Sequence, residues 1–370
     1  MRTKVAIACQ GGGSQTAFTA GVLKALSEAG LRDKFELVGI SGTSGGALCA
    51  TLIWYAIRKN ETPIWRRLID FWHDNTAQSE LELMMNAAVL NWMRGVNSGS
   101  LASFQTSPGM PLVQATNQLM TLGHRHEFTD LAALLRKHID FDEIASWGPQ
   151  PAGPVLVIGA ASVLSGRLRK FVSTKEAIKI EHVLASAAVP NLFTAVEVDG
   201  DALWDGLFSD NPPIDDLVRR SVVGEGNVPH ELWVIKINPT KRAKIPVLPD
   251  EIADRHNQLE GNVSLFQNLK LVEFLNDLIL GDAFRPGFLE YFEYRRPVLM
   301  PKAFAEGPDK PYYIPWIEMS DEMQQTLDHE GKFDRSPENI NRLIAHGEER
   351  CRVFLEERER CVAAAARITA

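Results

Sequence analysis

The strongest constraint on the fold is a glycine-rich pentapeptide that lies between an apolar run and a helical pattern. Gly42-Thr43-Ser44-Gly45-Gly46 directly follows the apolar run 35–40 and directly precedes the helix-like run 47–54. This order predicts a strand, a sharp turn and a helix. The small residues around Ser44 permit a strained turn that lifts its hydroxyl out of the backbone. Ser44 is therefore a candidate nucleophile, although glycine-rich turns with a serine also cap helices for structural reasons alone.

A second glycine run lies earlier in the chain, at the end of another apolar segment. The run 4–9 leads to Gly11-Gly12-Gly13, and apolar residues then recur at helical spacing up to Gly30. With the strand before Ser44, this pattern predicts a β-α-β unit and a parallel sheet with a right-handed crossover. The loops at the C-terminal ends of such strands converge. We therefore expect the N–H groups of Gly11, Gly12 and Gly13 to point into a crevice beside Ser44.

Two other interpretations of this loop do not fit its residues. A dinucleotide-binding fingerprint requires a third glycine where Thr16 stands. A phosphate-binding P-loop requires Gly-Lys-Ser/Thr, which the loop lacks. The loop is therefore interpreted as a set of donors for a developing negative charge, an oxyanion hole.

The rest of the chain alternates strands with helical segments and divides into three expected parts. Further strands are predicted over 155–163, 195–198, 202–204, 232–237 and 312–319. We expect an α/β fold, a three-layer α/β/α sandwich with a mainly parallel sheet and helical insertions. The expected parts are a catalytic core (1–242) with a helical insertion at about 62–146, a helical insertion or lid (243–307), and a returning strand with a C-terminal helix that packs on the core (308–370).

Apolar stripes at helical spacing run through the expected insertions. Two stripes lie within 62–146, the first formed by Trp65, Leu68, Ile69 and Trp72, and the second by Leu81, Met84, Met85, Ala88 and Trp92. Such stripes are more typical of core packing than of membrane contact, and they also suit an acyl-binding wall. A second helix is predicted over 264–280, after a basic, proline-containing linker at 241–249.

Composition and charge exclude several classes of protein. The chain of 370 residues has a net charge of −8, which argues against a nucleic-acid partner. No stretch approaches the roughly 18 apolar residues of a membrane-spanning helix. The apolar run after Lys4 is too short for a signal peptide, so we expect a cytoplasmic protein and leave signal-independent export open. The four cysteines are too widely spaced for a metal site.

A serine hydroxyl needs a base to become a good nucleophile. The acid-then-histidine order of an α/β-hydrolase triad would propose His329 or His346, but neither has a local signature. Asp205 is the better candidate, because it directly follows an apolar strand and precedes Gly206. The competing interpretation is a turn-forming Asp-Gly pair.

These three elements, in this order, resemble the patatin-like phospholipases, serine lipid acyl hydrolases that use a Ser-Asp dyad. The resemblance covers residues 4–240 and includes Asp210-Asn211-Pro212 and the segment Ala185–Pro190. It implies that Ser44 is the nucleophile, that Asp205 is the base, and that Gly11, Gly12 and Gly13 form the oxyanion hole. It also implies a patatin-like fold, a lipid or acyl-ester substrate and no metal or cofactor, and it leaves room for peripheral membrane contact. The oligomeric state stays undetermined.

Two departures from the family pattern affect the expected substrate. Gln15 and Thr16 stand where the family usually has arginine and glycine, and Leu207 follows Asp205-Gly206 where glycine or alanine is usual. The loop thus lacks a fixed positive charge, which favours neutral or short acyl esters over anionic phospholipids. The expected activity is that of a phospholipase A or other carboxylic-ester hydrolase that works through an acyl-enzyme. A transacylase would share every motif, whereas a non-catalytic acyl-binding protein would have lost Ser44 or Asp205.

Overall fold

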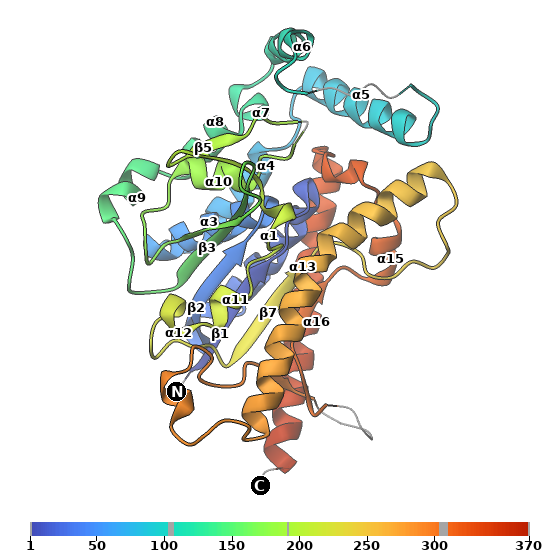
Figure 1. Cartoon of the computed structure of the whole chain (residues 1–370). Helices are drawn as coiled ribbons and strands as arrows, with labels where there is room; N and C mark the ends of the chain where they lie inside the picture. The colour runs from blue at the N-terminus through green and yellow to red at the C-terminus, as the bar shows by residue number, and fades with distance from the viewer. Residues whose placement is uncertain (1, 103–106, 191, 303–309, 369–370) are drawn as a thin grey trace.

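The core of the protein is one mixed β-sheet (Figure 1). The computed structural model describes residues 2–102, 107–190, 192–302 and 310–368. Within these residues the sheet has eight strands in the order β10-β7-β1-β2-β3-β6-β5, and β4 also pairs with β3. The strands are β1 (Thr3–Cys9), β2 (Phe35–Gly42), β3 (Val155–Ser162), β4 (Leu168–Val172), β5 (Val196–Val198), β6 (Asp201–Asp205), β7 (Glu231–Lys236) and β10 (Trp316–Glu318).

The sheet has a parallel half and an antiparallel half. Strands β10, β7, β1, β2 and β3 run parallel, as the opening β-α-β pattern predicts. Strands β4 and β6 both pair with β3 in the antiparallel sense. Because β4 spans Val157–Ala161 of β3, β2 and β6 must share the opposite edge of that strand. Strand β6 therefore lies end to end with β2.

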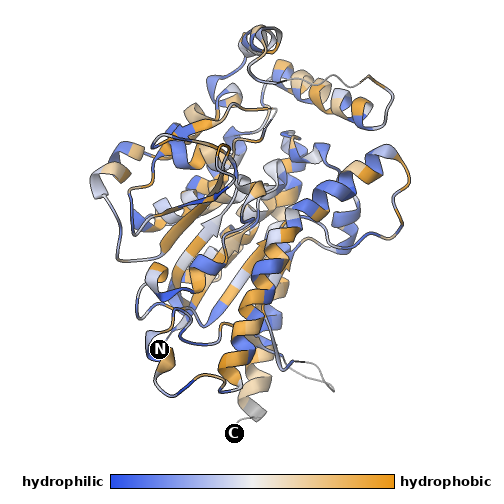
Figure 2. Cartoon of the chain, in the orientation of Figure 1, coloured by the Kyte–Doolittle hydropathy of each residue, from blue (hydrophilic) through white to orange (hydrophobic). Residues whose placement is uncertain are grey.

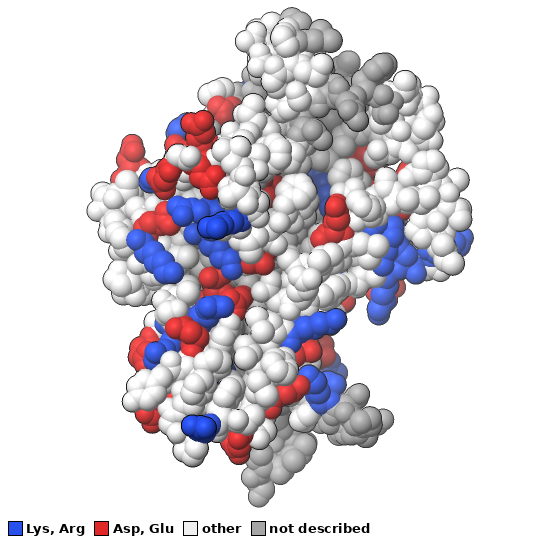
Figure 3. All heavy atoms as spheres, viewed as in Figure 1, with Lys and Arg blue, Asp and Glu red and all other residues white. Residues whose placement is uncertain are grey.

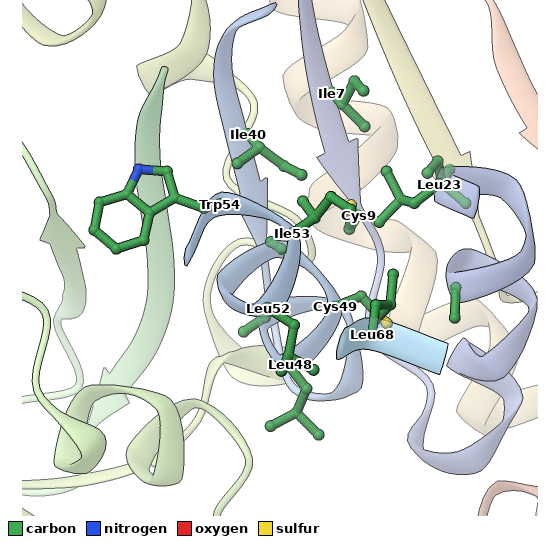
Figure 4. Close-up of a cluster of buried hydrophobic side chains, with 14 of the residues drawn as sticks. Ile7, Cys9, Leu23, Ile40, Leu48, Cys49, Leu52, Ile53, Trp54 and Leu68 are labelled. Atoms are coloured by element: carbon green, nitrogen blue, oxygen red, sulfur yellow. The ribbon is translucent and has the colours of Figure 1, made fainter. Parts of the chain in front are cut away.

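Helices cover both faces of the sheet, so the expected three-layer α/β/α fold is confirmed. Alternate residues of β1 enter two separate apolar clusters, with Val5, Ile7 and Cys9 on one face and Ala6 and Ala8 on the other. The first cluster packs the sheet against α1 (Ala17–Glu28), α3 (Gly45–Arg58), α4 (Arg66–Asp74), α10 (Ile180–Ser186) and α16 (Pro337–Ile368), and Figure 4 shows part of it. The second packs it against α11 (Asp215–Val218), α12 (Arg220–Val223) and α13 (Pro249–Leu280).

The long C-terminal helix α16 lies directly on α1. A Cβ atom on Gly21 would come within 1.9 Å of the Ile344 carbonyl oxygen, and one on Gly347 would come within 2.1 Å of the Phe18 carbonyl oxygen. The two glycines therefore permit the close approach of the helices. This contact holds the segment before α16, including η3 (Glu330–Lys332), beside the N-terminal glycine loop.

The helix α5 (Glu80–Asn97) stands away from the sheet, with α6 (Pro111–Thr121) beyond it (Figure 1). Its first turn is closed by a capping box between Ser79 and Glu82. The apolar stripe that the sequence suggested as core is exposed instead, because the opposite face of α5 meets the protein. Leu81, Met84 and Trp92 are 47%, 69% and 51% exposed.

Two other elements differ from their predicted extent. The helix predicted over 264–280 begins at Pro249, because proline suits the first turn and the Glu251 carboxylate accepts the Val247 and Leu248 N–H groups. The late strand predicted over 312–319 divides into β9 (Tyr312–Tyr313), which pairs with β8 (Met300–Pro301), and β10. The remaining short helices are α2 (Leu31–Lys34), α7 (His126–Thr129), α8 (Leu131–His138), α9 (Phe141–Trp147), α14 (Phe288–Tyr291) and α15 (Asp321–Gln325). In the described part of the chain, no helix is both long and apolar enough to cross a membrane.

Candidate active site

Ser44 lies in a strained turn between β2 and α3. Its backbone has φ 54° and ψ −130°, a conformation that costs free energy in a residue with a side chain. The turn is closed by glycines, since a Cβ atom on Gly42 or Gly46 would come within 2.4 Å of backbone atoms. The Ser44 N–H donates to Ser186 Oγ at 3.0 Å, and that hydroxyl donates to the Gly159 carbonyl. The tertiary structure therefore holds the turn that the pentapeptide predicts.

Asp205 lies at the end of β6, where that strand meets the end of β2. The residue is only 1% exposed. Its Oδ1 accepts the Leu207 N–H at 2.8 Å, and its own N–H donates to the Ala188 carbonyl at 2.9 Å. Burial raises the pKa of Asp205 to about 6, while the Ser44 hydroxyl, the Leu207 N–H and the charge of Lys332 act in the opposite direction. The structure thus brings Ser44 and Asp205 together.

The glycine loop lies against both residues. A Cβ atom on Gly11 would come within 2.9 Å of Ser44 Cβ, and the Gly11 N–H donates to Asn211 Oδ1 at 2.7 Å. The N–H groups of Gly12 and Gly13 have no acceptor within the described residues. The loop therefore offers two free donors beside Ser44, while the third, that of Gly11, is already engaged.

Gly45 adds a donor that the sequence analysis did not include. It is the first residue of α3, and its N–H also lacks an acceptor in the described ranges. The first N–H groups of any helix lack an intrahelical partner. The G-x-S-x-G pattern was the signal that could have identified it, because the residue after the serine commonly supplies such a donor.

Lys332 is a charged group near the site that the sequence analysis missed. Its carbonyl oxygen would lie 2.3 Å from a Cβ atom on Gly13, so η3 packs directly on the glycine loop. Its Nζ donates to Asn238 Oδ1 at 3.1 Å and forms no ion pair within the described residues. Burial lowers the pKa of Lys332 to about 8, against the opposing charges of Asp254, Asp205 and Glu260. No local motif marks this lysine.

The two histidines proposed for a triad lie in other surroundings. His346 Nε2 accepts the Ser320 N–H at 3.0 Å, and its ring packs against Phe18. His329 packs against Phe333, and burial lowers its pKa to about 4. Among the described residues, no histidine forms a hydrogen bond with Ser44 or Asp205.

One group of metal-ligand residue types lies elsewhere in the described structure. The ligand atoms of Glu176, His182 and Asp199 lie within 4.8 Å of one another. His182 Nδ1 accepts the Lys179 N–H, so the neutral ring carries its proton on Nε2, the nitrogen nearest Glu176. A metal would need a lone pair on that nitrogen. Asp199 also pairs with Lys179 and Arg169, so this group does not fit a metal ion.

Comparison with known families agrees with the fold. The sequence profile described as patatin-like phospholipase matches residues 7–218, more than half of the chain. The chain therefore belongs to the patatin-like phospholipase family. Membership of this family indicates lipid acyl hydrolase activity.

Solved structures similar to this chain are distant in sequence. VipD from Legionella pneumophila is 15% identical, with a TM-score of 0.39 over 97% of this chain and 67% of that chain. Human GIVD cytosolic phospholipase A2, in complex with methyl gamma-linolenyl fluorophosphonate, is 13% identical, with a TM-score of 0.33 over 96% and 60%. ExoU of Pseudomonas aeruginosa, in complex with SpcU, is 18% identical, with a TM-score of 0.25 over 73% and 51%. The chain thus spans about half to two thirds of these proteins. No curated protein sequence matches it.

Proposed function

We propose that this protein is a serine acyl-ester hydrolase that acts on lipids through a dyad of Ser44 and Asp205. The observation that carries the proposal is the placement of a buried carboxylate, with a raised pKa, beside the hydroxyl of a strained serine. An ordinary aspartate is a weak base at neutral pH, whereas a carboxylate that titrates near 6 accepts a proton more readily. The closeness of the two residues, the backbone strain at Ser44 and the raised pKa of Asp205 therefore support the same assignment.

The proposed acylation step starts with attack of Ser44 Oγ on the carbonyl carbon of the ester. The hydroxyl proton passes to Asp205, and the carbonyl oxygen becomes an oxyanion. We propose that the N–H groups of Gly12, Gly13 and Gly45, which have no acceptor within the described residues, donate to that oxygen. The intermediate then collapses, the bond to the alcohol breaks, and Asp205 returns its proton to the leaving oxygen.

Deacylation repeats these transfers with water as the nucleophile. Asp205 takes a proton from the water as it attacks the acyl carbon, and the same donors stabilise the second oxyanion. Ser44 leaves with the proton held by Asp205, and the carboxylic acid is released. No group outside the chain is required for the proton balance.

Lys332 is proposed as an electrostatic residue for both steps. During attack, the negative charge moves from the Asp205 carboxylate to the substrate oxygen at the glycine loop. Lys332 packs on that loop at Gly13 and interacts electrostatically with Asp205. A fixed cation near both positions stabilises the charge throughout the transfer. Lys332 would also place a positive charge at the glycine loop, where Gln15 provides none.

The test is a panel of p-nitrophenyl esters and phospholipid vesicles, run on the wild type and Ser44→Ala side by side. A fluorophosphonate probe should label the wild type once, at Ser44, and should not label Ser44→Ala. Labelling at another serine, or ester turnover that survives Ser44→Ala, contradicts the proposal. Analysis of products with an added acceptor alcohol separates a hydrolase from a transacylase.

A further inference from the structure

We propose that α5 and the segment that leads into α13 form one docking surface for an anionic lipid bilayer. The proposal rests on the proposed function, because it identifies the surface through which a lipid substrate would reach that site. The docking surface comprises Leu81, Met84, Trp92, Lys241, Lys244, Ile245, Val247 and Leu248.

The helix α5 presents one polar face to the protein and one apolar face to the outside. On the inner face, Asn86 donates to Asp334, Arg94 pairs with Asp328, and Asn97 donates to Glu330. The outer face carries the exposed stripe, and the residues 83–93 include no charge. An uncharged helix face that contains Met and Trp suits the boundary between lipid headgroups and acyl chains.

The segment before α13 combines exposed apolar and basic residues. Ile245, Val247 and Leu248 are 86%, 75% and 54% exposed. Lys241 and Lys244 are exposed and form no ion pair within the described residues. Apolar side chains that enter the interface, beside cations that meet lipid phosphates, are the two components of interfacial binding.

The two parts of the docking surface lie at the same end of the molecule. Figure 2 shows hydrophobic residues along α5 and in the loop that enters α13, and Figure 3 shows Lys and Arg side chains gathered near that loop. A cavity of about 300 Å³ lies between them, and its lining includes Arg94 and Gly95 of α5, Asp250 and Asp254 of α13, and the carboxylates of Asp328 and Glu330. The docking surface therefore flanks an opening.

Two residues at this opening also line a small pocket near the glycine loop. Asp254 and Asp328 line both the larger cavity and a small pocket of about 10 Å³. That small pocket is also lined by Gln15 and by Lys332, which packs on Gly13. A lipid that leaves the bilayer between α5 and α13 would thus approach the glycine loop.

A bilayer suits this surface better than a second copy of the chain does. Interfaces between proteins are depleted in lysine, whereas this surface exposes two lysines that form no ion pair within the described residues. The unpaired lysines instead complement an anionic membrane. These lysines act within the Debye length of about 10 Å, so at contact they affect membrane binding more than the net charge of the whole chain does.

Vesicle sedimentation of the Ser44→Ala protein tests the surface without hydrolysis. Vesicles of phosphatidylcholine alone are compared with vesicles that contain about 30% phosphatidylglycerol. The variants are Met84→Asp/Trp92→Asp and Lys241→Glu/Lys244→Glu, and folding is checked by thermal melting. Leu164→Asp is the matched control, because Leu164 is 83% exposed and lies outside the docking surface. We expect both double variants to bind the mixed vesicles at least about tenfold more weakly, and the control to bind like the parent.

Several outcomes would overturn the docking surface. These are failure of the parent protein to bind either vesicle, unchanged binding by both double variants, or equal loss in the control. A dimer that Met84→Asp/Trp92→Asp converts to a monomer, with vesicle binding unchanged, would assign the surface to self-association instead. Failure of the proposed function is a separate result, because binding here needs no catalysis.

Discussion

Ser44 and Asp205 are held at the facing ends of two strands that share one edge of β3. Gly42 at the end of β2 pairs with Ile158, and Asp205 at the end of β6 pairs with Ala160. Because β2 runs parallel to β3 and β6 runs antiparallel to it, the two chain segments run toward each other. The sheet itself therefore sets the separation of the proposed nucleophile and base.

Replacing the proposed base should reduce catalysis without loss of folding. We expect Asp205→Asn to lower ester turnover by about 10² or more, since general-base catalysis contributes roughly 10²–10⁴. Steady-state kinetics on a soluble p-nitrophenyl ester provides the measurement. The control is Asp282→Asn at an exposed position, which should turn over like the wild type. Turnover that survives Asp205→Asn but is lost on replacing His329 would favour a histidine triad.

The same replacement should stabilise the protein in a pH-dependent way. Because burial raises the pKa of Asp205 to about 6 from 3.8, its charged form is unfavourable in the folded state. The wild type is fully stabilised below pH 3.8 and loses stability as the pH rises through 6. Asp205→Asn should thus gain up to about 3 kcal/mol over the wild type between pH 4 and 7. Denaturant unfolding across this range provides the measurement, and a difference that does not vary with pH contradicts the raised pKa.

The turnover of the wild type should fall at both low and high pH, with the acid limb of the profile set by Asp205 and the alkaline limb set by Lys332. Turnover should fall below about pH 6 as Asp205 is protonated, and above about pH 8 as Lys332 loses its charge. Lys332→Met should lack the alkaline limb and move the acid limb to higher pH, because the cation that lowers the pKa of Asp205 is gone. Lys332→Arg should keep turnover beyond pH 8. Identical profiles for all three proteins would exclude an electrostatic role.

Stability distinguishes this role of Lys332 from a structural one. A buried ammonium without an ion pair opposes folding, so Lys332→Met should be at least as stable as the wild type while it turns over more slowly. Lys236 provides the contrast, because its buried Nζ pairs with Glu318 at 2.8 Å. Thermal melting should show Lys236→Met to be destabilised. Comparable destabilisation of Lys332→Met would indicate a structural role.

The glycine loop should not tolerate a methyl group beside Ser44. A Cβ atom on Gly11 would come within 2.6 Å of the Thr43 carbonyl oxygen and 2.9 Å of Ser44 Cβ. Gly11→Ala should therefore displace the turn and reduce fluorophosphonate labelling of Ser44 at least about tenfold, since small shifts of a reacting group are costly. Gly226→Ala is the matched control, because a Cβ atom there meets nothing within 4 Å. Equal labelling of the two variants would show that the loop adapts.

Local patterns in the sequence were enough to predict the central strands and the residues that carry the proposed chemistry. Alternation and apolar runs identify β1, β2, β3 and β7, because buried parallel strands need continuous apolar residues. Glycines mark the turn at Ser44 and the loop at Gly11, because only glycine fits where backbones approach so closely. Asp205 was proposed as the base because it ends an apolar strand and precedes Gly206.

Only the tertiary structure decided which distant groups meet and which apolar faces stay uncovered. The periodicity of the sequence shows that α5 is amphipathic, but it does not show which face of the helix packs against other elements. In the structure, the stripe at Met84 and Trp92 faces outward. Likewise, Lys332 reaches the glycine loop because α16 packs on α1, a contact between opposite ends of the chain. Local sequence determines what each segment can become. The packing of the whole chain determines that a lysine near the C-terminal helix lies beside a loop near the N-terminus.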